Sequence, residues 1–294
     1  SAASDVYKRQ SPTLPNPDCY LPNNGGYHDD SIDIQINVTY WMQDLQQVDA
    51  PGEGTTTVMS ARVKLTDVSQ FRTGFANKYP SKQARHVNDM TKRFKAVMGI
   101  DGDYCLYHEQ GIVVRNGQTL RMRPHKGRDE LIVDENGDFH LITCTTQAKW
   151  DEYIAGGGTV LHAFCFGPAL VVDGVPLTSL DDVTIDNGKA KKAQRMVIGQ
   201  IGKLEYLILT NEGPESTAPK SVGFDLVQMA NLCVQFGLDN AYNLDGGSSS
   251  TIALNNQKIN SPSSHKNRMV GDCIWFATLV KEETWRETQG TENQ

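Results

Sequence analysis

Glycine-containing dipeptides between short apolar runs are the feature that most limits how this chain can fold. Asn116-Gly117, Asn136-Gly137 and Asp173-Gly174 each stand between two such runs. Tight turns between antiparallel strands need positive φ angles, which Asn, Asp and Gly adopt at the least cost. The spacing therefore predicts a succession of hairpins, and with it a largely antiparallel sheet system.

Three other segments have the pattern of strands. Between residues 32 and 40 every second residue is apolar, which is the period of a half-buried strand. Residues 57–68 have a similar composition and predict a second strand. A short apolar segment, residues 96–100, predicts a strand that leads into the polar turn of residues 101–103.

Few segments have the period of a helix. Residues 81–95 predict a polar helix with Ser81 as its N-cap. The clearest helix falls within residues 222–237, where Gly237 is suited to end it. Its apolar stripe is expected to consist of Leu226, Met229, Ala230, Cys233 and Val234. Because few helices and many strands are predicted, we expect the α+β class, with a mixed, largely antiparallel sheet system and a few flanking helices.

Composition excludes several classes of protein. The formal net charge of -7 and the pI of about 5.5 argue against a nucleic-acid binder, because no basic face is evident. No run approaches the roughly 18 apolar residues that a membrane-spanning helix needs, so we expect no membrane span. Any binding of phosphate must therefore depend on a local group of cations.

The six cysteines are scattered, and five of them lie inside apolar runs. This distribution favours buried free thiols over a disulfide framework. We expect Cys105, Cys144 and Cys165 to be buried and unpaired. No Cys or His spacing matches a zinc site.

The most unusual passage is Leu244 to Ser250, "LDGGSSS", where an apolar run gives way to an aspartate, two glycines and three serines. Glycines let a backbone approach a ligand closely, serines add donors, and Asp245 places a carboxylate at a strand end. The alternative is an ordinary hairpin, since Asp-Gly is a common turn signal. A single glycine would suffice for that turn, which favours a polar ligand site.

The passage "FDLVQMANLCVQFGLDNAYNLDGGSSSTIAL", followed by "RMVGDCIWFAT", resembles the C-terminal signature of the phosphodiester glycosidase family. Upstream, "AVMGIDGDYC", "GPALVVDGV" and "AQRMVIGQIGKLEYLILTNEG" resemble further segments of that family in the same order. The resemblance covers roughly residues 57–279. It implies the family's fold and hydrolysis of a sugar-1-phosphodiester at its glycosidic bond, with N-acetylglucosamine as the sugar in some members.

Composition and the resemblance together suggest a division of the chain. We expect a polar N-terminal tail at residues 1–30, an N-terminal strand and linker at 31–56, a catalytic domain at 57–280 and a polar C-terminal tail at 281–294. A secreted, cell-surface or phage-associated location is favoured. Oligomeric state and the identity of the sugar stay open.

Four positions depart from the family's pattern. Asp101 stands where asparagine is usual, Met196 where threonine is common, and Ser248 in place of a third glycine. Glu212 is only an approximate counterpart of the family's acidic residue in that segment. These departures leave a second hypothesis open, in which the same fold binds a glycan on a phage particle or cell surface without cutting it.

Hydrolysis at an anomeric carbon needs a carboxylate, help for the leaving phosphate and hydrogen bonds to sugar hydroxyls. Asp245 is the first candidate for the catalytic carboxylate, and its possible partners are Asp101, Asp103 and Glu212. The candidate phosphate ligands are Arg195 and Arg268, because a guanidinium matches phosphate oxygens. The loop residues expected to bind substrate are Gly246, Gly247, Ser248 and Ser249.

Two geometric expectations follow. Asp245, Gly246 and Gly247 should line the largest polar cleft of the protein. Arg195 and Arg268 should both point into that cleft, close enough for one phosphate group to bridge them. The partner of this site would be a carbohydrate or a sugar phosphate.

Other residues have two interpretations each. Asp101 to Asp103 could form a solvated turn or hold a divalent cation such as Ca²⁺ or Mg²⁺, although no cofactor is required by the sequence. The basic run from Arg121 to Asp129 fits a solvated loop better than the rim of a cleft for an anionic polymer. His162 lies between apolar residues and fits a core histidine better than an acid.

Two familiar catalytic motifs are missing. A Ser/His/Asp hydrolase would need a GxSxG elbow, and "GGSSS" lacks the glycine after the serine. A phosphate-binding P-loop would need a lysine after the glycines, and none follows here.

Overall fold

The computed structural model describes residues 2–183, 188–216, 220–260 and 267–292. Within these residues the strands form three sheets, and every strand pair is antiparallel. The first sheet has the order β1-β2-β4-β15-β14-β16-β12-β13, and β3 pairs with β2. Its strands are β1 (Gly26–His28), β2 (Ile32–Trp41), β3 (Gln47–Val48), β4 (Thr56–Leu65), β12 (Ala169–Val172), β13 (Val175–Pro176), β14 (Arg195–Gly202), β15 (Glu205–Asn211) and β16 (Asn240–Leu244).

The other two sheets have five strands each. One has the order β10-β9-β11-β7-β8, from β7 (Gly111–Arg115), β8 (Gln118–Arg123), β9 (Glu130–Val133), β10 (Phe139–Ile142) and β11 (His162–Phe164). The other has the order β18-β17-β6-β19-β5, from β5 (Phe71–Phe75), β6 (Met98–Asp101), β17 (Ile252–Leu254), β18 (Gln257–Lys258) and β19 (Asp272–Phe276).

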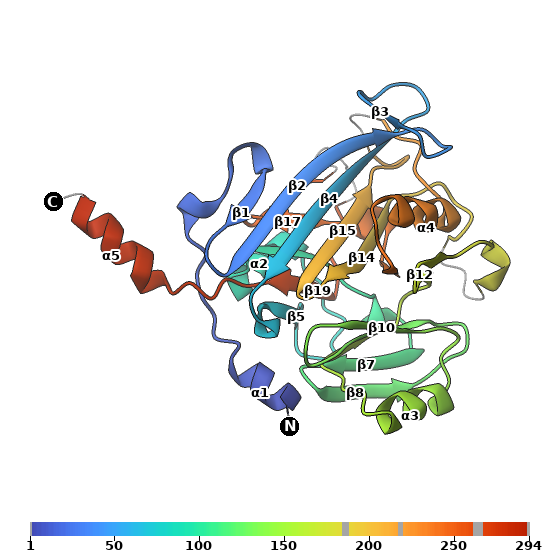
Figure 1. The fold of residues 1–294 in the computed structure, drawn as a ribbon, viewed down its shortest axis with the longest axis horizontal. Helices are drawn as coiled ribbons and strands as arrows, with labels where there is room; N and C mark the ends of the chain where they lie inside the picture. Colours follow the sequence, from blue (N-terminus) through green and yellow to red (C-terminus); the bar gives the residue numbers. More distant parts are fainter. Residues whose placement is uncertain (1, 184–187, 217–219, 261–266, 293–294) are drawn as a thin grey trace.

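The main core lies where the three sheets meet. Ile198 on β14, Ile274 on β19 and Val133 on β9 belong to one buried cluster, although each comes from a different sheet. Figure 1 shows the long strands of the first sheet running beside the other two sheets. Burial of apolar surface from all three sheets in one core makes them a single packed body.

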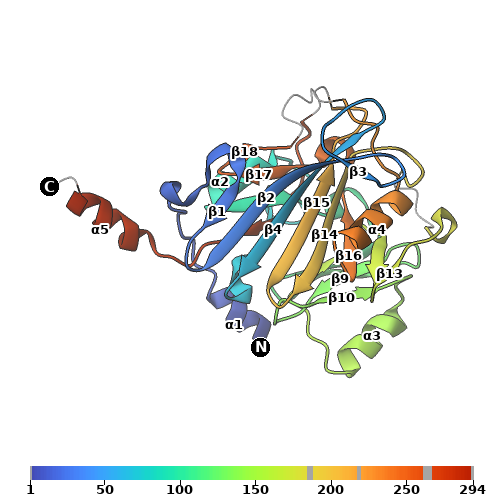
Figure 2. The same cartoon turned by 45° about the horizontal axis from the view of Figure 1, so that its top comes forward.

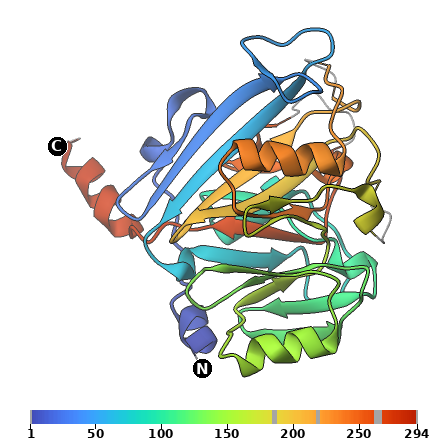
Figure 3. The ribbon, with the colours of Figure 1, turned by 45° about the vertical axis from the view of Figure 1, so that its right-hand side comes forward.

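The helices lie on the outside of this sheet system (Figure 1). Helix α4 (Leu226–Gln235) lies on the first sheet (Figure 3). Its residues Met229 and Cys233 belong to one buried cluster with Val197 and Leu209 of that sheet. The other helices are α1 (Ala2–Lys8), α2 (Val87–Phe94), α3 (Gln147–Ala155) and α5 (Glu282–Glu292). Figure 2 shows α5 extending away from the sheets. None of the described helices is long and apolar enough to cross a membrane.

The predicted fold class and hairpins are confirmed. Asn116-Gly117 joins β7 to β8 with φ angles of 52° and 76°, and Asp173-Gly174 joins β12 to β13 with 48° and 80°. Gly137, in the turn between β9 and β10, has a φ of 86°. Gly237 follows α4 with a φ of 82°, as the helix end requires.

Two details of the predicted helices are wrong. Helix α2 begins at Val87, because the Ser81 hydroxyl accepts from the Gln83 N–H (3.2 Å) in a local turn and Arg85 pairs with Val270 in a β-bridge. In α4 Val234 is 42% exposed, and Leu232 is buried instead.

The ends of the chain and the cysteines also differ in part from expectation. Strand β1 pairs with β2 and Tyr27 is fully buried, so this part of residues 1–30 belongs to the first sheet. All six cysteines are free, and Cys105 and Cys165 are buried as expected. The expectation for Cys144 is wrong, because it lies exposed in a turn after β10, where its N–H donates to Asp129 (2.8 Å).

Candidate active site

The Asp245 loop follows β16, an inner strand of the first sheet. Its backbone joins two distant segments: the Asp245 N–H donates to the carbonyl of Gly102 (3.1 Å), and the Gly247 N–H donates to the carbonyl of Gln194 (2.9 Å). A Cβ atom on Gly246 would lie 2.8 Å from that Gln194 oxygen. Glycine is therefore required at position 246 for the close approach of these two backbones.

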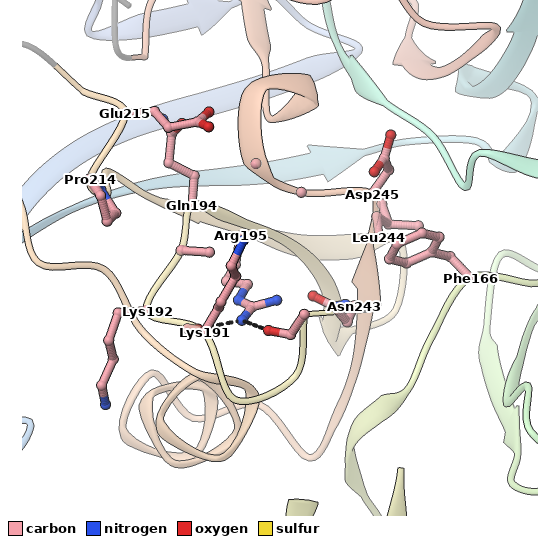
Figure 4. A pocket seen from close by; sticks show the side chains of 14 residues that line it. Phe166, Lys191, Lys192, Gln194, Arg195, Pro214, Glu215, Asn243, Leu244 and Asp245 are labelled. Atoms are coloured by element: carbon pink, nitrogen blue, oxygen red, sulfur yellow. Dashed lines mark hydrogen bonds between the residues drawn. The ribbon is translucent and has the colours of Figure 1, made fainter. Parts of the chain in front are cut away.

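A cavity of about 390 Å³ opens beside this loop (Figure 4). We call it the Asp245 pocket. It is lined by Phe166, Gly188, Lys191, Lys192, Ala193, Gln194, Arg195, Pro214, Glu215, Asn243, Leu244, Asp245, Gly246 and Gly247. Its volume suits one sugar unit, at the lower end of the range for small-molecule sites.

The expectation that this would be the largest polar cleft is wrong. A cavity of about 640 Å³ lies between residues 51–54 and 220–222, and a polar one of about 560 Å³ lies beside residues 200–203. The number of donors on a loop does not set the volume of the space beside it. Two carboxylates, Asp245 and Glu215, line the Asp245 pocket.

Asp245 is half-buried at the wall of this pocket. Burial raises the pKa of its carboxyl to about 6, although the nearby Ser249 hydroxyl and the charge of Arg268 oppose the rise. The group is therefore mostly ionised at pH 7 and protonated in mild acid. A carboxylate in this range can act as a base or nucleophile near neutral pH.

Asp101 ends β6 and is fully buried. Its Oδ1 accepts from the Thr251 N–H (3.0 Å), and its Oδ2 has no hydrogen-bond partner among the described residues. Burial and the charge of Asp245 raise the pKa of Asp101 well above its ordinary value. Because this carboxyl is fully buried and does not line the Asp245 pocket, its position argues against the expected direct catalytic role.

Asp103 is also fully buried, and it belongs to a charge cluster with Arg115 and Asp272. The Arg115 guanidinium lies 3.2 Å from Asp103 and 3.4 Å from Asp272. Burial would raise the pKa of Asp103, but the Arg115 charge and backbone donors hold it low, whereas burial and the Asp103 charge raise the pKa of Asp272. The two acids therefore carry about one negative charge, which Arg115 neutralises.

This cluster includes the residues with the geometry closest to a metal site in the described chain. One oxygen each of Asp103 and Asp272 and the Cys105 sulfur lie within 4.8 Å of one another. The Arg115 guanidinium already donates to both carboxylates. The buried position of Asp103 and its ion pair argue against both a solvated turn and a catalytic role for it.

Glu212 lies behind the lining of the Asp245 pocket. It is 8% exposed, and its Oε2 accepts from the Ser216 hydroxyl (2.5 Å) and from Gln194 Nε2 (3.3 Å). The carboxylate that lines the pocket is Glu215, three residues further along the same segment. Sequence reasoning missed Glu215, although the acidic "NEGPES" segment was the signal that could have indicated it.

The expected pairing of Arg195 and Arg268 around one phosphate is not supported. Arg195 lines the pocket, but its guanidinium donates to the carbonyls of Phe224 (3.1 Å), Gly188 (2.8 Å) and Lys191 (2.7 Å). Figure 4 shows this side chain held along the pocket wall. Arg268 is exposed and does not line the pocket, although its charge acts on Asp245. Backbone carbonyls accept the Arg195 guanidinium donors that the sequence suggested for phosphate.

Two buried amides line the pocket with oxygens that have no hydrogen-bond partner among the described residues. Asn243 donates through Nδ2 to the carbonyl of Gly167 (3.0 Å), so its Oδ1 must face the other way. Gln194 donates to Glu212, which likewise leaves its Oε1 unpaired. Sequence reasoning missed both, although Asn243 precedes Asp245 by two positions and so shares its face of the strand.

The sequence model of the phosphodiester glycosidase family matches residues 94–277, which is more than half of the chain. The chain belongs to the phosphodiester glycosidase family. No curated protein sequence matches it significantly.

Solved structures similar to this member of the family agree with its fold. The catalytic domain of zebrafish N-acetylglucosamine-1-phosphodiester alpha-N-acetylglucosaminidase, auto-inhibited by its pro-peptide, has a TM-score of 0.63 at 14% identity, with 94% of this chain and 93% of that chain covered. A hypothetical protein from Synechocystis has a TM-score of 0.55 at 14% identity, with 84% and 62% covered. A Burkholderia pseudomallei protein described as exported has 0.50 at 15%, with 78% and 75% covered.

The departures from the family's pattern fit the fold without strain. Met196 is fully buried in β14 and belongs to the main core. Gly247 has a φ of 61°, but Ser248 is not among the residues with positive φ. A third glycine is therefore not required for the conformation of the Asp245 loop. Ser248 and Ser249 are buried within the turn of the loop and do not line the pocket.

Histidine has no place in this pocket. None of the described lining residues is a histidine, which leaves a Ser/His/Asp mechanism without its base. His162 is fully buried, and its Nδ1 accepts from the Asn116 N–H (3.2 Å). Burial lowers the pKa of His162 to about 3, so it is the neutral core histidine that the sequence favoured.

Proposed function

We propose that this phosphodiester glycosidase hydrolyses the bond between the anomeric carbon of a sugar and a phosphodiester. The observation that carries the proposal is the position of Asp245, a half-buried carboxylate with a pKa of about 6 at the wall of a sugar-sized pocket. Positive charge develops at the anomeric carbon in the transition state of glycoside hydrolysis. A preorganised carboxylate at that point stabilises the charge.

The roles of the other groups follow from their positions. Glu215 lines the same pocket and supplies the second carboxylate, which would orient a water molecule. A phosphodiester leaves as a stable anion, so it needs cations rather than a strong general acid. Lys191 is exposed at the pocket, and Arg268 places its charge near Asp245. These two cations, in place of Arg195, would meet the leaving phosphate.

The lining favours a neutral sugar in the pocket itself. Asn243 Oδ1 and Gln194 Oε1 are unpaired acceptors, and Asp245 and Glu215 add carboxylate oxygens. Small side-chain movements would let these acceptors meet the hydroxyl or amide donors of a sugar. The name of the zebrafish relative makes N-acetylglucosamine the first sugar to test. A glycan or cell-surface polymer would carry such a sugar phosphate in nature.

The test is product analysis with N-acetylglucosamine 1-(methyl phosphate). Wild-type protein should release free N-acetylglucosamine and methyl phosphate, both visible by NMR. Asp245→Asn should lose at least about 100-fold in kcat. The matched control is Asp239→Asn, an exposed aspartate just before the other end of β16, which should keep full turnover. Binding of the sugar without any product would favour the non-catalytic glycan-binding module instead.

A further inference from the structure

A second pocket, with a volume of about 400 Å³, lies where three segments meet. Its lining shares no residue with the Asp245 pocket and consists of Tyr79, Pro80, Lys82, Cys105, Leu106, Tyr107, His108, Glu109, Leu120, Arg121 and Arg123. The Tyr107 hydroxyl donates to the carbonyl of Lys82 (3.0 Å), which fixes one wall to another. The proposed function gives this pocket no role.

Arg121 lines the second pocket and joins two of its segments by hydrogen bonds. Its guanidinium donates to the carbonyls of Cys105 (2.9 Å), His108 (2.6 Å) and Gln110 (2.9 Å). These bonds attach residues 105–110, the segment before β7, to Arg121 at the start of the basic run. Arg121 therefore contributes positive charge to a preformed pocket, while its donors are already used.

The walls of the second pocket are aromatic and apolar. The rings of Tyr79 and Tyr107 line it together with Leu106 and Leu120. The Tyr107 ring also lies 4.9 Å, centroid to centroid, from that of Tyr104, which is 38% exposed. This arrangement extends the aromatic surface out of the pocket. The apolar face of a pyranose ring packs well on such a surface.

The available donors at this pocket are cationic. Lys82 is exposed, and the Arg123 side chain is 63% exposed. The one acid in the lining, Glu109, is 91% exposed and lies 3.9 Å from Arg123, which makes a weak ion pair. A positive pocket on a protein with a net charge of -7 is a local feature that attracts an anion.

His108 adds an unsatisfied polar group to the same lining. Both of its ring nitrogens are buried, and neither has a hydrogen-bond partner among the described residues. Burial and the charge of Arg128 lower the pKa of His108 to about 4, so the ring is neutral at pH 7. A neutral imidazole has one donor nitrogen and one acceptor nitrogen, which point in different directions, so each can meet a separate hydroxyl group.

We infer that the second pocket binds an anionic saccharide, with a sugar ring against Tyr79 and Tyr107 and its carboxylate, sulfate or phosphate beside Lys82 and Arg123. The inference does not depend on turnover at Asp245. It assigns a role to the basic run from Arg121 to Asp129, for which the sequence favoured a solvated loop. Part of that run lies in β8 and lines a pocket.

The experiment measures binding by calorimetry with four probes: a hyaluronan tetrasaccharide, a heparin tetrasaccharide, neutral chitotetraose and a single-stranded DNA of ten nucleotides. Wild-type protein should bind at least one anionic tetrasaccharide at least about 10-fold more tightly than chitotetraose or DNA. The double variant Lys82→Glu/Arg123→Glu should weaken that binding at least about 10-fold, because glutamate removes both cationic donors and reverses their charge. Tyr79→Ala should weaken it about 5- to 10-fold through loss of stacking.

Neither charged residue belongs to the Asp245 pocket, so the double variant should keep its thermal midpoint and its turnover of the small phosphodiester. The inference is overturned if neither anionic tetrasaccharide binds, if the variants bind as the wild type does, or if DNA binds equally well. Absence of turnover in every protein, with this binding pattern intact, would instead count against the proposed function alone.

Discussion

The backbone N–H of Asp245 donates to the carbonyl of Gly102 across 3.1 Å, and this bond joins the loop after β16 to the turn after β6. It places the half-buried carboxyl of Asp245 near the fully buried carboxyl of Asp101, whose pKa it helps to raise. The two acids therefore have different environments. Burial raises the pKa of both carboxyls, to about 6 for Asp245 and well above the ordinary value for Asp101, and the consequences of each shift can be tested separately.

Asp245→Asn should stabilise the protein while abolishing its turnover. The folded-state pKa of Asp245 is raised to about 6, so ionisation opposes folding as the pH rises from about 4 to 6. The variant avoids this cost, and its free energy of unfolding should exceed that of the wild type by about 1–2 kcal/mol at pH 8. At pH 4 the two should be equal. Urea unfolding at both values measures the difference, and equal stability at pH 8 would contradict the raised pKa.

Asp101→Asn should keep both fold and turnover at neutral pH. Asparagine keeps the acceptor for the Thr251 N–H and, like the protonated acid, carries no charge. Since the folded-state pKa of Asp101 is raised, the wild type loses stability as the pH rises toward that value, and the variant should not. We expect turnover within about 3-fold of the wild type at pH 7. A loss as large as that of Asp245→Asn would show that Asp101 takes a direct part in the reaction.

Arg195→Lys should loosen the segment that forms one wall of the pocket. Lysine cannot reproduce the fork that holds the carbonyls of Gly188, Lys191 and Phe224. We expect a loss of about 1–2 kcal/mol in stability and faster amide exchange in residues 188–192. Arg62→Lys, an exposed arginine paired with Glu205, is the matched control and should change neither quantity. Unchanged exchange in the Arg195 variant would mean that the fork does not order this wall.

Chelation of divalent cations should leave turnover and thermal midpoint unchanged. The Arg115 guanidinium lies between Asp103 and Asp272 and neutralises the roughly single charge that they share. No second cation is needed to hold these carboxylates together. Turnover measured before and after dialysis against EDTA checks this. A loss that Ca²⁺ or Mg²⁺ restores would contradict it.

The parts of the fold that the sequence predicted depend on local chemistry. Asn116-Gly117 and Asp173-Gly174 fix hairpins because few other residues adopt their φ angles. Helix α4 has its own capping box at Asp225 and Gln228 and an apolar stripe. Such signals lie within a few residues of the structure that they determine.

The parts that the sequence did not predict depend on contacts between distant segments. Nothing near Arg195 indicates that the carbonyls of Gly188 and Phe224 will take up its donors. Nothing near Asp103 indicates that Arg115 and Asp272 will enclose it. In the sequence, a charged residue next to a motif looks the same whether it binds a ligand in a pocket or donates to backbone carbonyls. Only the folded structure distinguishes these two roles.

The most direct test of glycosidic cleavage is hydrolysis of N-acetylglucosamine 1-(methyl phosphate) in ¹⁸O-labelled water, with products separated by mass spectrometry. Attack at the anomeric carbon, beside Asp245, should place the label in N-acetylglucosamine and leave methyl phosphate unlabelled. Because the free sugar exchanges its anomeric oxygen slowly with water, the products must be analysed early. Label in methyl phosphate would show cleavage of the phosphorus–oxygen bond and would contradict the proposed reaction.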